Sequence, residues 1–309
     1  MKIKVLLCCF FFQCVLLCSN AQSPFLVVLG TTQDGGSPHL GCSKKCCEML
    51  FSSPDPSRKV VSLGIVDPLE KKYWMLEATP NFTTQASWLN ELCGFQHHDL
   101  PDGIFITHAH IGHYTGLMYL GREVMSSNQT PVYAMTRMKG FLIQNGPWSQ
   151  LVNLKNINLK NINPGIETKL SNSISVIPFK VPHRDEFSET VGYKIIGPQK
   201  TILFIPDIDK WGKWNKKIID EINDVDMAFI DGTFYDEEEI NYRDISEIPH
   251  PFIIETMHLL KDQEPLVKSK INFIHLNHTN PLLDTTSQQY KSVTDNGFSV
   301  AFFKQKVNL

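Results

Sequence analysis

The stretch Gly103-Ile104-Phe105-Ile106-Thr107-His108-Ala109-His110-Ile111-Gly112-His113 joins an apolar run to three closely spaced histidines. The apolar residues predict a buried strand, and the H-x-H-x-x-H pattern places three imidazoles at its carboxyl end. Neutral imidazole is the commonest metal ligand in proteins, so the stretch predicts a metal site.

The second half of the chain repeats this arrangement. Four more β-rich runs each end close to a histidine or an aspartate: 174–181 with His183, 201–205 with Asp207, 227–230 with Asp231, and 271–276 with His278. A single polar residue at a strand end is usually a solvated surface group. Five such strands, with the one before His108, instead predict side chains that meet at one edge of a sheet, where α/β proteins bind ligands.

The first half alternates strand-like and helical segments. We expect strands at 25–29, 60–66, 73–76 and 131–134, and helices at 81–92, 115–122 and 137–144. Such alternation favours sheets that are covered by helices.

Composition narrows the class of protein. The chain has 309 residues, 42% of them hydrophobic, and a formal net charge of −3. The hydrophobic content supports a full core. The sequence has no cluster of Lys and Arg, which argues against a nucleic-acid partner. We therefore expect a small-molecule substrate.

Residues 1–21 are built like a secretory signal peptide. Met1-Lys2-Ile3-Lys4 is basic, residues 5–17 are almost wholly apolar, and Ser19-Asn20-Ala21 offers small residues for cleavage. The apolar run is shorter than the roughly 20 residues that a membrane-spanning helix needs, so we expect no stable membrane insertion after its removal. Residues 22–309 would then form one exported, periplasmic domain. A lipid anchor on Cys18 is the alternative.

These motifs resemble the metallo-β-lactamase superfamily. The motif at 107–113 is followed by His183, Asp207 and His278 in that family's order, and the likeness covers most of residues 25–280. Further likeness to pyrroloquinoline quinone biosynthesis protein B-like members and their phosphodiesterase-like relatives comes from Gly30–Gly36, Thr115-Gly116-Leu117, Thr279-Asn280-Pro281 and a cysteine cluster. The resemblance implies an α/β fold, an αββα sandwich of two mixed β-sheets with helices on both outer faces.

The resemblance also implies a site for two Zn²⁺ ions, with Fe or Mn as alternatives. His108, His110 and His183 would bind the first metal, His113 and His278 the second, and Asp207 would bridge them. His275 is the alternative to His278. Because His275 lies within an apolar run whereas His278 opens a loop, the pattern favours His278.

Gly112 departs from the family pattern. Most relatives carry an Asp there as a ligand of the second metal, and Asp209 and Asp231 are the nearest candidates to replace it. Without a replacement, His113, His278, Asp207 and a bridging hydroxide still satisfy four-coordinate zinc. A single metal, or a weakly bound second one, is the alternative.

Hydrolysis is the activity that the resemblance implies, with a metal-bound hydroxide attacking an ester bond of the phosphodiester type. His250, between Pro249 and Pro251, would protonate the leaving group, with His258 as the alternative. Asp231 would orient a ligand histidine. The other hypotheses are metal-dependent oxidation at a single iron, and a non-enzymatic carrier that holds a cofactor through its metal.

Cysteines suggest a second metal-type cluster. Of the eight in the chain, four lie in residues 1–21, and His39, Cys42, Cys46 and Cys47 form the pattern H-x-x-C-x-x-x-C-C. This cluster predicts a structural zinc, as in the quinone-pathway relatives, or a disulfide from Cys42 to one of the adjacent pair. Cys93 is expected to be a small buried residue.

Overall fold

The computed structural model describes residues 23–96, 100–240 and 248–309. The predicted signal peptide lies outside these residues. Among them, no helix combines the length and the apolar character needed to cross a membrane.

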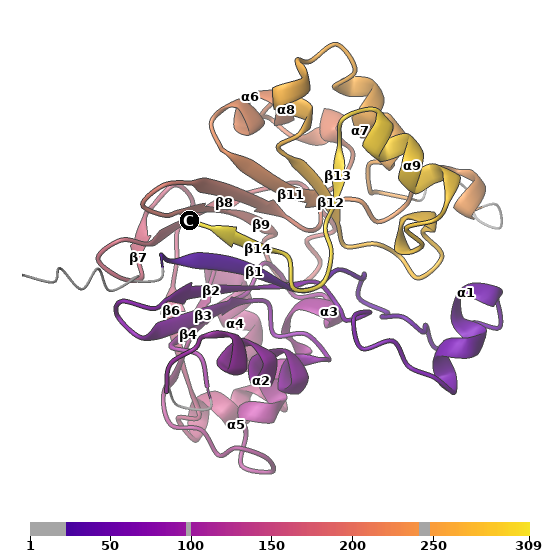
Figure 1. Ribbon diagram of the computed structural model, residues 1–309. Helices are drawn as coiled ribbons and strands as arrows, with labels where there is room; N and C mark the ends of the chain where they lie inside the picture. Colours follow the sequence, from indigo (N-terminus) through magenta and orange to yellow (C-terminus); the bar gives the residue numbers. More distant parts are fainter. Residues whose placement is uncertain (1–22, 97–99, 241–247) are drawn as a thin grey trace, which may run out of the picture.

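Two mixed sheets of seven strands each form the centre of the described part (Figure 1). The first sheet contains, in spatial order, β14 (Lys306–Asn308), β1 (Phe25–Gly30), β2 (Ser62–Asp67), β3 (Lys72–Leu76), β4 (Gly103–Phe105), β5 (Thr130–Ala134) and β6 (Ile157–Asn161). The second contains β13 (Ser299–Val300), β12 (Ile271–Ile274), β11 (Met227–Asp231), β10 (Thr201–Ile205), β9 (Val191–Ile196), β8 (Ser175–Lys180) and β7 (Thr168–Lys169).

Helices cover the outer face of each sheet (Figure 1). On the first sheet lie α2 (Phe82–Leu92), α4 (Thr136–Gln144) and α5 (Trp148–Asn153). On the second lie α6 (Ile218–Asn223), α7 (Ile253–Leu259), α8 (Pro265–Lys268) and α9 (Gln288–Asp295). Two short helices remain: α3 (Ile111–Tyr114) at the edge of the sandwich, and α1 (Lys45–Glu48) on a segment that projects from it.

Strand alternation divides the core into three layers. Leu26 and Val28 of β1 face the second sheet and pack with Phe204 and Phe229 between the sheets. The intervening Val27 and Leu29 face α2 and α4, and a third cluster fills the space between the second sheet and its helices. The predicted αββα sandwich is confirmed.

The carboxyl ends of the strands meet at one edge. β10, β11 and β12 are parallel neighbours, and β8 runs in the same direction because both it and β10 are antiparallel to β9. At this edge Thr32, just after β1, bridges to Leu276, just after β12, and so ties the two sheets together. The segments that follow β1, β3, β4, β8, β10, β11 and β12 therefore converge. The sequence predicts this for five of them, those after β4, β8, β10, β11 and β12, and not for those after β1 and β3.

The predicted helix at 115–122 differs in detail. The chain turns into α3 already at Ile111, inside the histidine motif, and then continues as a 3₁₀ helix over Thr115–Leu120. Gly116 makes this tighter path possible: its N–H donates to the Ala78 carbonyl, and a Cβ at 116 would lie 2.2 Å from the Thr79 carbonyl oxygen.

Candidate metal centre

Four predicted ligands meet at the strand ends. One ligand atom from each of His108, His110, His183 and Asp207 lies within 4.8 Å of the others. Asp207 Oδ2 is 3.4 Å from His108 Nε2 and 3.2 Å from His183 Nε2, and His183 Nε2 is 3.2 Å from His110 Nδ1. Zinc with bonds of about 2.0–2.1 Å has tetrahedron edges of about 3.3–3.4 Å, so these spacings fit one ion.

A second group lies on the other side of Asp207. It contains Asp34, His113, Asp207 and His275. Asp34 Oδ1 is 2.9 Å from His113 Nε2 and 3.3 Å from His275 Nε2, and Asp207 Oδ2 is 3.9 Å from His113 Nε2. The same oxygen, Oδ2 of Asp207, thus faces both groups, which is the arrangement expected of a bridging carboxylate.

The expectation that His278 serves the second metal is wrong, because the structure places His275 there and His278 elsewhere. His275 follows β12 directly and has φ +67°. This left-handed conformation, uncommon for a residue other than glycine, breaks the alternation of the strand and turns the ring to the metal side. The sequence-based choice assumed that alternation continued through residue 275.

The carboxylate missing at Gly112 is also supplied from an unexpected place. Asp209 and Asp231 do not replace it: Asp209 lies beside His183 Nδ1 and Lys213, and Asp231 accepts hydrogen bonds from Thr233 and the Ile208 N–H. Asp34 instead occupies the space beside Gly112, where a Cβ would lie 2.4 Å from Asp34 Oδ1 and 2.6 Å from its Cα.

Each histidine has an orienting partner on the nitrogen that faces away from its group, as ligand histidines usually do. Four pairs are hydrogen-bonded, namely His108 with Thr107 Oγ1, His110 with Glu186, His183 with Asp209, and His275 with Thr233 Oγ1. The fifth is an ionic contact without hydrogen-bond geometry, in which Glu77 Oε1 lies 3.5 Å from His113 Nδ1. These contacts fix which nitrogen of each ring is available to a metal.

Buried atoms without partners test whether a metal fits. Among the described residues, Nε2 of His108 in the first group and Nε2 of His113 in the second are buried and make no hydrogen bond of ordinary geometry. Leaving such atoms unpaired is costly, whereas a cation between them would satisfy them. The residues therefore fit a metal at each group.

In the absence of a metal, the buried carboxylates stay charged and raise the pKa of His113 well above its usual value and that of His183 to about 10, whereas His108 stays neutral, so a cation bound here would replace protons on two of the rings. Burial lowers the pKa of His108 well below its usual value, which keeps the ring neutral. Burial alone would raise the pKa of Asp207 and of Asp34, but neighbouring histidines outweigh it and hold both carboxylates well below the usual range. Asp34 and Glu77 raise the pKa of His113 against the effect of burial, so this corner of the site attracts positive charge.

A family model described as "Beta-lactamase superfamily domain" matches residues 74–275. The chain belongs to this superfamily. The matched residues include the histidine motif, His183, Asp207 and His275, but not Asp34 or the cysteine cluster.

Relatives of two kinds are close to the chain. "Coenzyme PQQ synthesis protein B" of Xanthomonas euvesicatoria pv. vesicatoria (strain 85-10) is 24% identical over 304 residues, covering 89% of this chain and 97% of that protein. The crystal structure of Zn²⁺-bound PqqB from Methylobacterium extorquens superimposes with a TM-score of 0.75 at 20% identity, covering 92% and 100% of the two chains. A diphosphatase of the PhnP family gives a TM-score of 0.62 at 20% identity, covering 92% and 96%. These structures share the fold.

The predicted general acid lies against the bridging carboxylate. His250 Nδ1 is 2.8 Å from Asp231 Oδ2 and 3.2 Å from Asp207 Oδ1. Asp231 is fully buried and is itself held by the Thr233 N–H and hydroxyl, at 2.8 and 2.7 Å. Asp231 therefore orients His250, rather than one of the histidines of the two metal groups.

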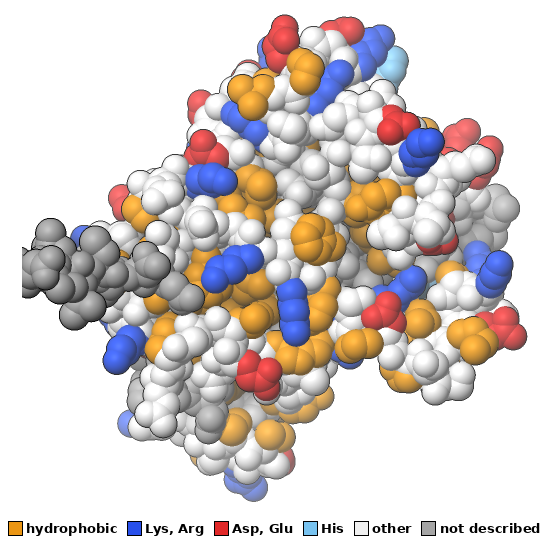
Figure 2. Space-filling model, viewed as in Figure 1, with side chains coloured by type: hydrophobic (Ala, Val, Ile, Leu, Met, Phe, Trp, Pro, Cys, Tyr) orange, Lys and Arg blue, Asp and Glu red, His pale blue; other side chains and the backbone are white. Residues whose placement is uncertain are grey.

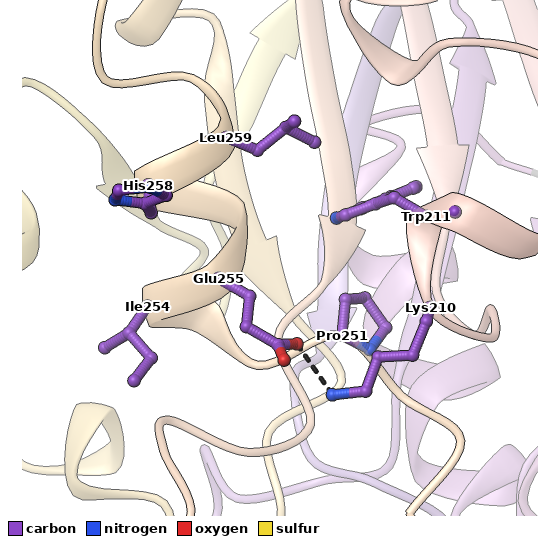
Figure 3. A pocket seen from close by; sticks show the side chains of 8 residues that line it. Lys210, Trp211, Pro251, Ile254, Glu255, His258 and Leu259 are labelled. Carbon is purple, nitrogen blue, oxygen red and sulfur yellow. Dashed lines mark hydrogen bonds and ion pairs between the residues drawn. The ribbon is translucent and has the colours of Figure 1, made fainter.

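A cavity of about 660 Å³ lies between α7 and the segment after β10 (Figure 3). Its walls include Lys210 and Pro251, the residues directly after Asp209 and His250, and Lys210 forms a 2.6 Å ion pair with Glu255 across it. None of the candidate ligands lines this cavity. His258, the alternative acid, lies in its wall and points away from Lys210, so the structure favours His250 over it.

The cysteines form a separate cluster with His278. Ligand atoms of Cys42, Cys46, Cys47 and His278 lie within 4.8 Å of one another, with Cys46 Sγ 3.9 Å from both neighbouring sulfurs. Zinc–sulfur bonds of about 2.3 Å give tetrahedron edges of about 3.8 Å, so the spacing fits zinc. Burial lowers the pKa of His278 to about 4, which keeps its ring neutral.

His39 is not the fourth member of this cluster. Its ring stacks on that of His278 with centroids 4.3 Å apart, and its Nδ1 lies 2.9 Å from the Leu40 carbonyl. The disulfide alternative is not seen, since Cys42, Cys46, Cys47 and Cys93 are free thiols. Cys93 is buried, as predicted.

Asp34 and Glu77 are the site residues that the sequence reasoning missed. Glu77 follows β3 directly, so the rule that strand ends deliver polar side chains would have found it. Asp34 lies four residues beyond β1, and 241 positions separate it from His275. Only the Gly112 departure signalled that another carboxylate was needed.

Proposed function

We propose that this protein is a zinc-dependent hydrolase that holds two Zn²⁺ ions and cleaves an ester bond, of the phosphodiester type. The observation that carries the proposal is the pair of ligand groups that share Oδ2 of Asp207. Two metals about 3.5–4 Å apart stabilise both the attacking and the leaving oxygen of such a displacement.

The ligands of the two zinc ions can be assigned from the two groups. His108, His110, His183 and Asp207 would hold the first zinc, and Asp34, His113 and His275 the second, with Asp207 between them. When bound, zinc lowers the pKa of the water that it holds to about 7 and so supplies a nucleophile.

His250 would supply the proton. Asp231 holds its Nδ1, which leaves Nε2 to give a proton to the leaving oxygen. The position against Asp207 keeps the acid beside both metal groups. The PhnP-family diphosphatase supports phosphate esters as the substrate class, because it shares the fold over 92% of this chain.

Metal content and turnover together test the proposal. Residues 22–309 would be purified, their metals measured, and hydrolysis followed with bis(p-nitrophenyl) phosphate, p-nitrophenyl phosphate and p-nitrophenyl acetate. We expect zinc in the protein, activity on the diester, and its loss in His110→Ala but not in His258→Ala. Protein without metal, or diesterase activity that survives His110→Ala, refutes the proposal.

A metal-dependent oxidation is the second candidate, favoured by likeness to Coenzyme PQQ synthesis protein B over 97% of that protein's length. A single iron on His108, His110, His183 and Asp207 would then use oxygen as the oxidant. Iron in the purified protein and oxygen consumption with a reduced substrate would support this role. Zinc alone, with hydrolysis that is unchanged under anaerobic conditions, counts against it.

A further inference from the structure

Among the residues of the two histidine groups, Asp34 alone lies on the segment between β1 and β2, which also carries Cys42, Cys46 and Cys47. Up to Gln33 the chain is tied to the sandwich, since the Gln33 N–H donates to the Leu276 carbonyl at 2.9 Å. Beyond Gly36 it leaves the body and runs into α1, which projects from the sandwich (Figure 1). Asp34 therefore lies at the junction between the residues that are hydrogen-bonded to the sandwich and the segment that projects from it.

Direct contacts connect Asp34 to the cysteine cluster. Gly35, its neighbour, packs against the ring of His39 so closely that a Cβ at 35 would lie 2.4 Å from His39 Cδ2. His39 in turn stacks on His278, and its N–H donates to Cys47 Sγ at 3.4 Å. The path from Asp34 to two members of the cluster therefore passes through only Gly35 and His39.

Apart from the cluster, the projecting segment is loosely packed. A cavity of about 530 Å³ separates α1 from the loop that follows His278. Leu40, Met49 and Phe51 are 89%, 67% and 57% exposed, and hydrophobic side chains appear on the surface over this segment (Figure 2). An apolar core does not fix the segment, which leaves as its anchors the cluster and the hydrogen bonds that Arg58 donates to Ser37 Oγ and to the Leu283 carbonyl.

We propose that the cysteine cluster, when it holds a metal, fixes the loop that presents Asp34, so that occupancy of the cysteine cluster sets the affinity of the second active-site metal. The coupling rests on the metal centre of the proposed function and adds a means of regulating it. The first metal is exempt, because none of its four ligands lies on the segment between β1 and β2 that carries the cysteines.

The size of the effect follows from what Asp34 must do. With the cluster loaded, the carboxylate is already placed for the second metal. With the cluster empty, the loop must be ordered at each binding event, and that ordering lowers affinity. Loss of a group that orients a metal ligand typically lowers affinity about 10- to 100-fold, and we expect a loss in this range for the second metal.

Metal titration of the demetallated protein tests the coupling. Co²⁺ bound to thiolates gives an intense charge-transfer absorption, and Co²⁺ bound to histidine and carboxylate gives only ligand-field bands, so the two kinds of site are read separately. We expect Cys42→Ser, which removes one of the four cluster ligands, to weaken the thiolate site about 10²- to 10³-fold and the second histidine-site metal about 10- to 100-fold, with the first metal unchanged. Cys93→Ser, a buried cysteine outside the cluster, is the matched control and should change neither site.

A double-mutant cycle shows whether the coupling runs through Asp34. In an Asp34→Ala background the second metal is already weakened, and adding Cys42→Ser should then cost less than about threefold. Equal affinity of wild type and Cys42→Ser for the second metal overturns the proposal, and so do independent, additive effects of the two substitutions.

Folding of the variants is controlled without mutation. A mercurial reagent that displaces metal from the cysteines of folded wild-type protein should reproduce the Cys42→Ser result, and an unchanged affinity for the second metal after this treatment overturns the coupling. These experiments measure metal binding and not turnover, so failure of the coupling can be told apart from failure of the proposed function. Wild-type protein that binds no metal at the histidines overturns the proposed function and the coupling together, whereas an uncoupled second metal overturns only the coupling.

Discussion

His275→Ala and His278→Ala should remove different metals, although the two histidines are only three residues apart. His275 Nε2 lies 3.3 Å from Asp34 Oδ1 in the second metal group, and its Nδ1 is held by Thr233 Oγ1 at 2.9 Å. His278 completes the cysteine cluster and presents its Nδ1 to Asn277 Oδ1 at 3.0 Å. Each substitution therefore removes one of four protein ligands from one site.

The expected loss follows from the ligand count. Four-ligand structural zinc sites bind with about 10–16 kcal/mol, which is about 2.5–4 kcal/mol for each ligand if they contribute equally. One missing ligand then weakens binding by about 10²- to 10³-fold. His275→Ala should show this loss at the second histidine site and leave the thiolate site within about threefold, because the ligands of that site are untouched.

His278→Ala should weaken mainly the thiolate site and, to a smaller extent, the second histidine site. The thiolate site weakens by about 10²- to 10³-fold. The second histidine site weakens only through the loop, by the smaller factor expected for lost orientation. Zinc stoichiometry and Co²⁺ spectra of both variants measure these losses. If His278→Ala abolished the second histidine-site metal and spared the thiolate absorption, the placement of both residues would be refuted.

Three further predictions concern the acid, the packing at Gly112 and the pH dependence of stability. His250→Gln should lower kcat by about 10²- to 10⁴-fold on a phosphodiester with an alkyl leaving group, with metal content unchanged, and by less on bis(p-nitrophenyl) phosphate, because p-nitrophenolate needs little protonation to leave. An equal loss for alkyl and p-nitrophenyl leaving groups would contradict an acid role. Gly112→Ala should lower the free energy of unfolding, measured in urea, by about 1–3 kcal/mol, because the new Cβ would overlap Asp34. Gly140→Ala, in a helix with open space around residue 140, should leave the free energy of unfolding unchanged or raise it. Equal stability of the two variants would contradict the overlap. Burial raises the pKa of Glu239 from 4.5 to about 7, so the protonated carboxyl stabilises the folded protein at low pH and this stabilisation is lost as the pH rises through 7. The fall in Tm between about pH 5 and pH 8 should therefore be smaller in Glu239→Gln, and an identical fall would refute the assignment.

Strand ends are the part of the site that pattern alone could predict. His108, His183, Asp207 and Asp231 come shortly after buried strands, and the parallel arrangement of those strands brings them to one edge. Period-two alternation and β-rich composition are local properties, so the sequence carries them directly. For the fold, these local patterns predicted only sheets covered by helices, and the αββα sandwich came from the resemblance to the metallo-β-lactamase superfamily.

Backbone conformation is where pattern failed. The choice between His275 and His278 depended on a single φ angle, +67° at His275, which no residue type at that position announces. The prediction for His39 was wrong for a similar reason: its spacing to the cysteines suited a ligand, but its ring stacks on His278, which is the histidine in the cluster. A spacing motif identifies which residues can meet, and the backbone decides which of them do.

Gly112 and Asp34 have to be understood as one feature. A Cβ at 112 would lie 2.6 Å from the Cα of Asp34, so the loop can approach α3 only where residue 112 has no side chain. A carboxylate on α3 and a carboxylate from the loop are therefore mutually exclusive in this geometry. The loop supplies the ligand from the projecting segment, which has its own metal-type cluster, whereas an Asp at position 112 would supply it from α3. The apparent defect in the histidine motif is thus the condition that lets a second site in the protein influence the first.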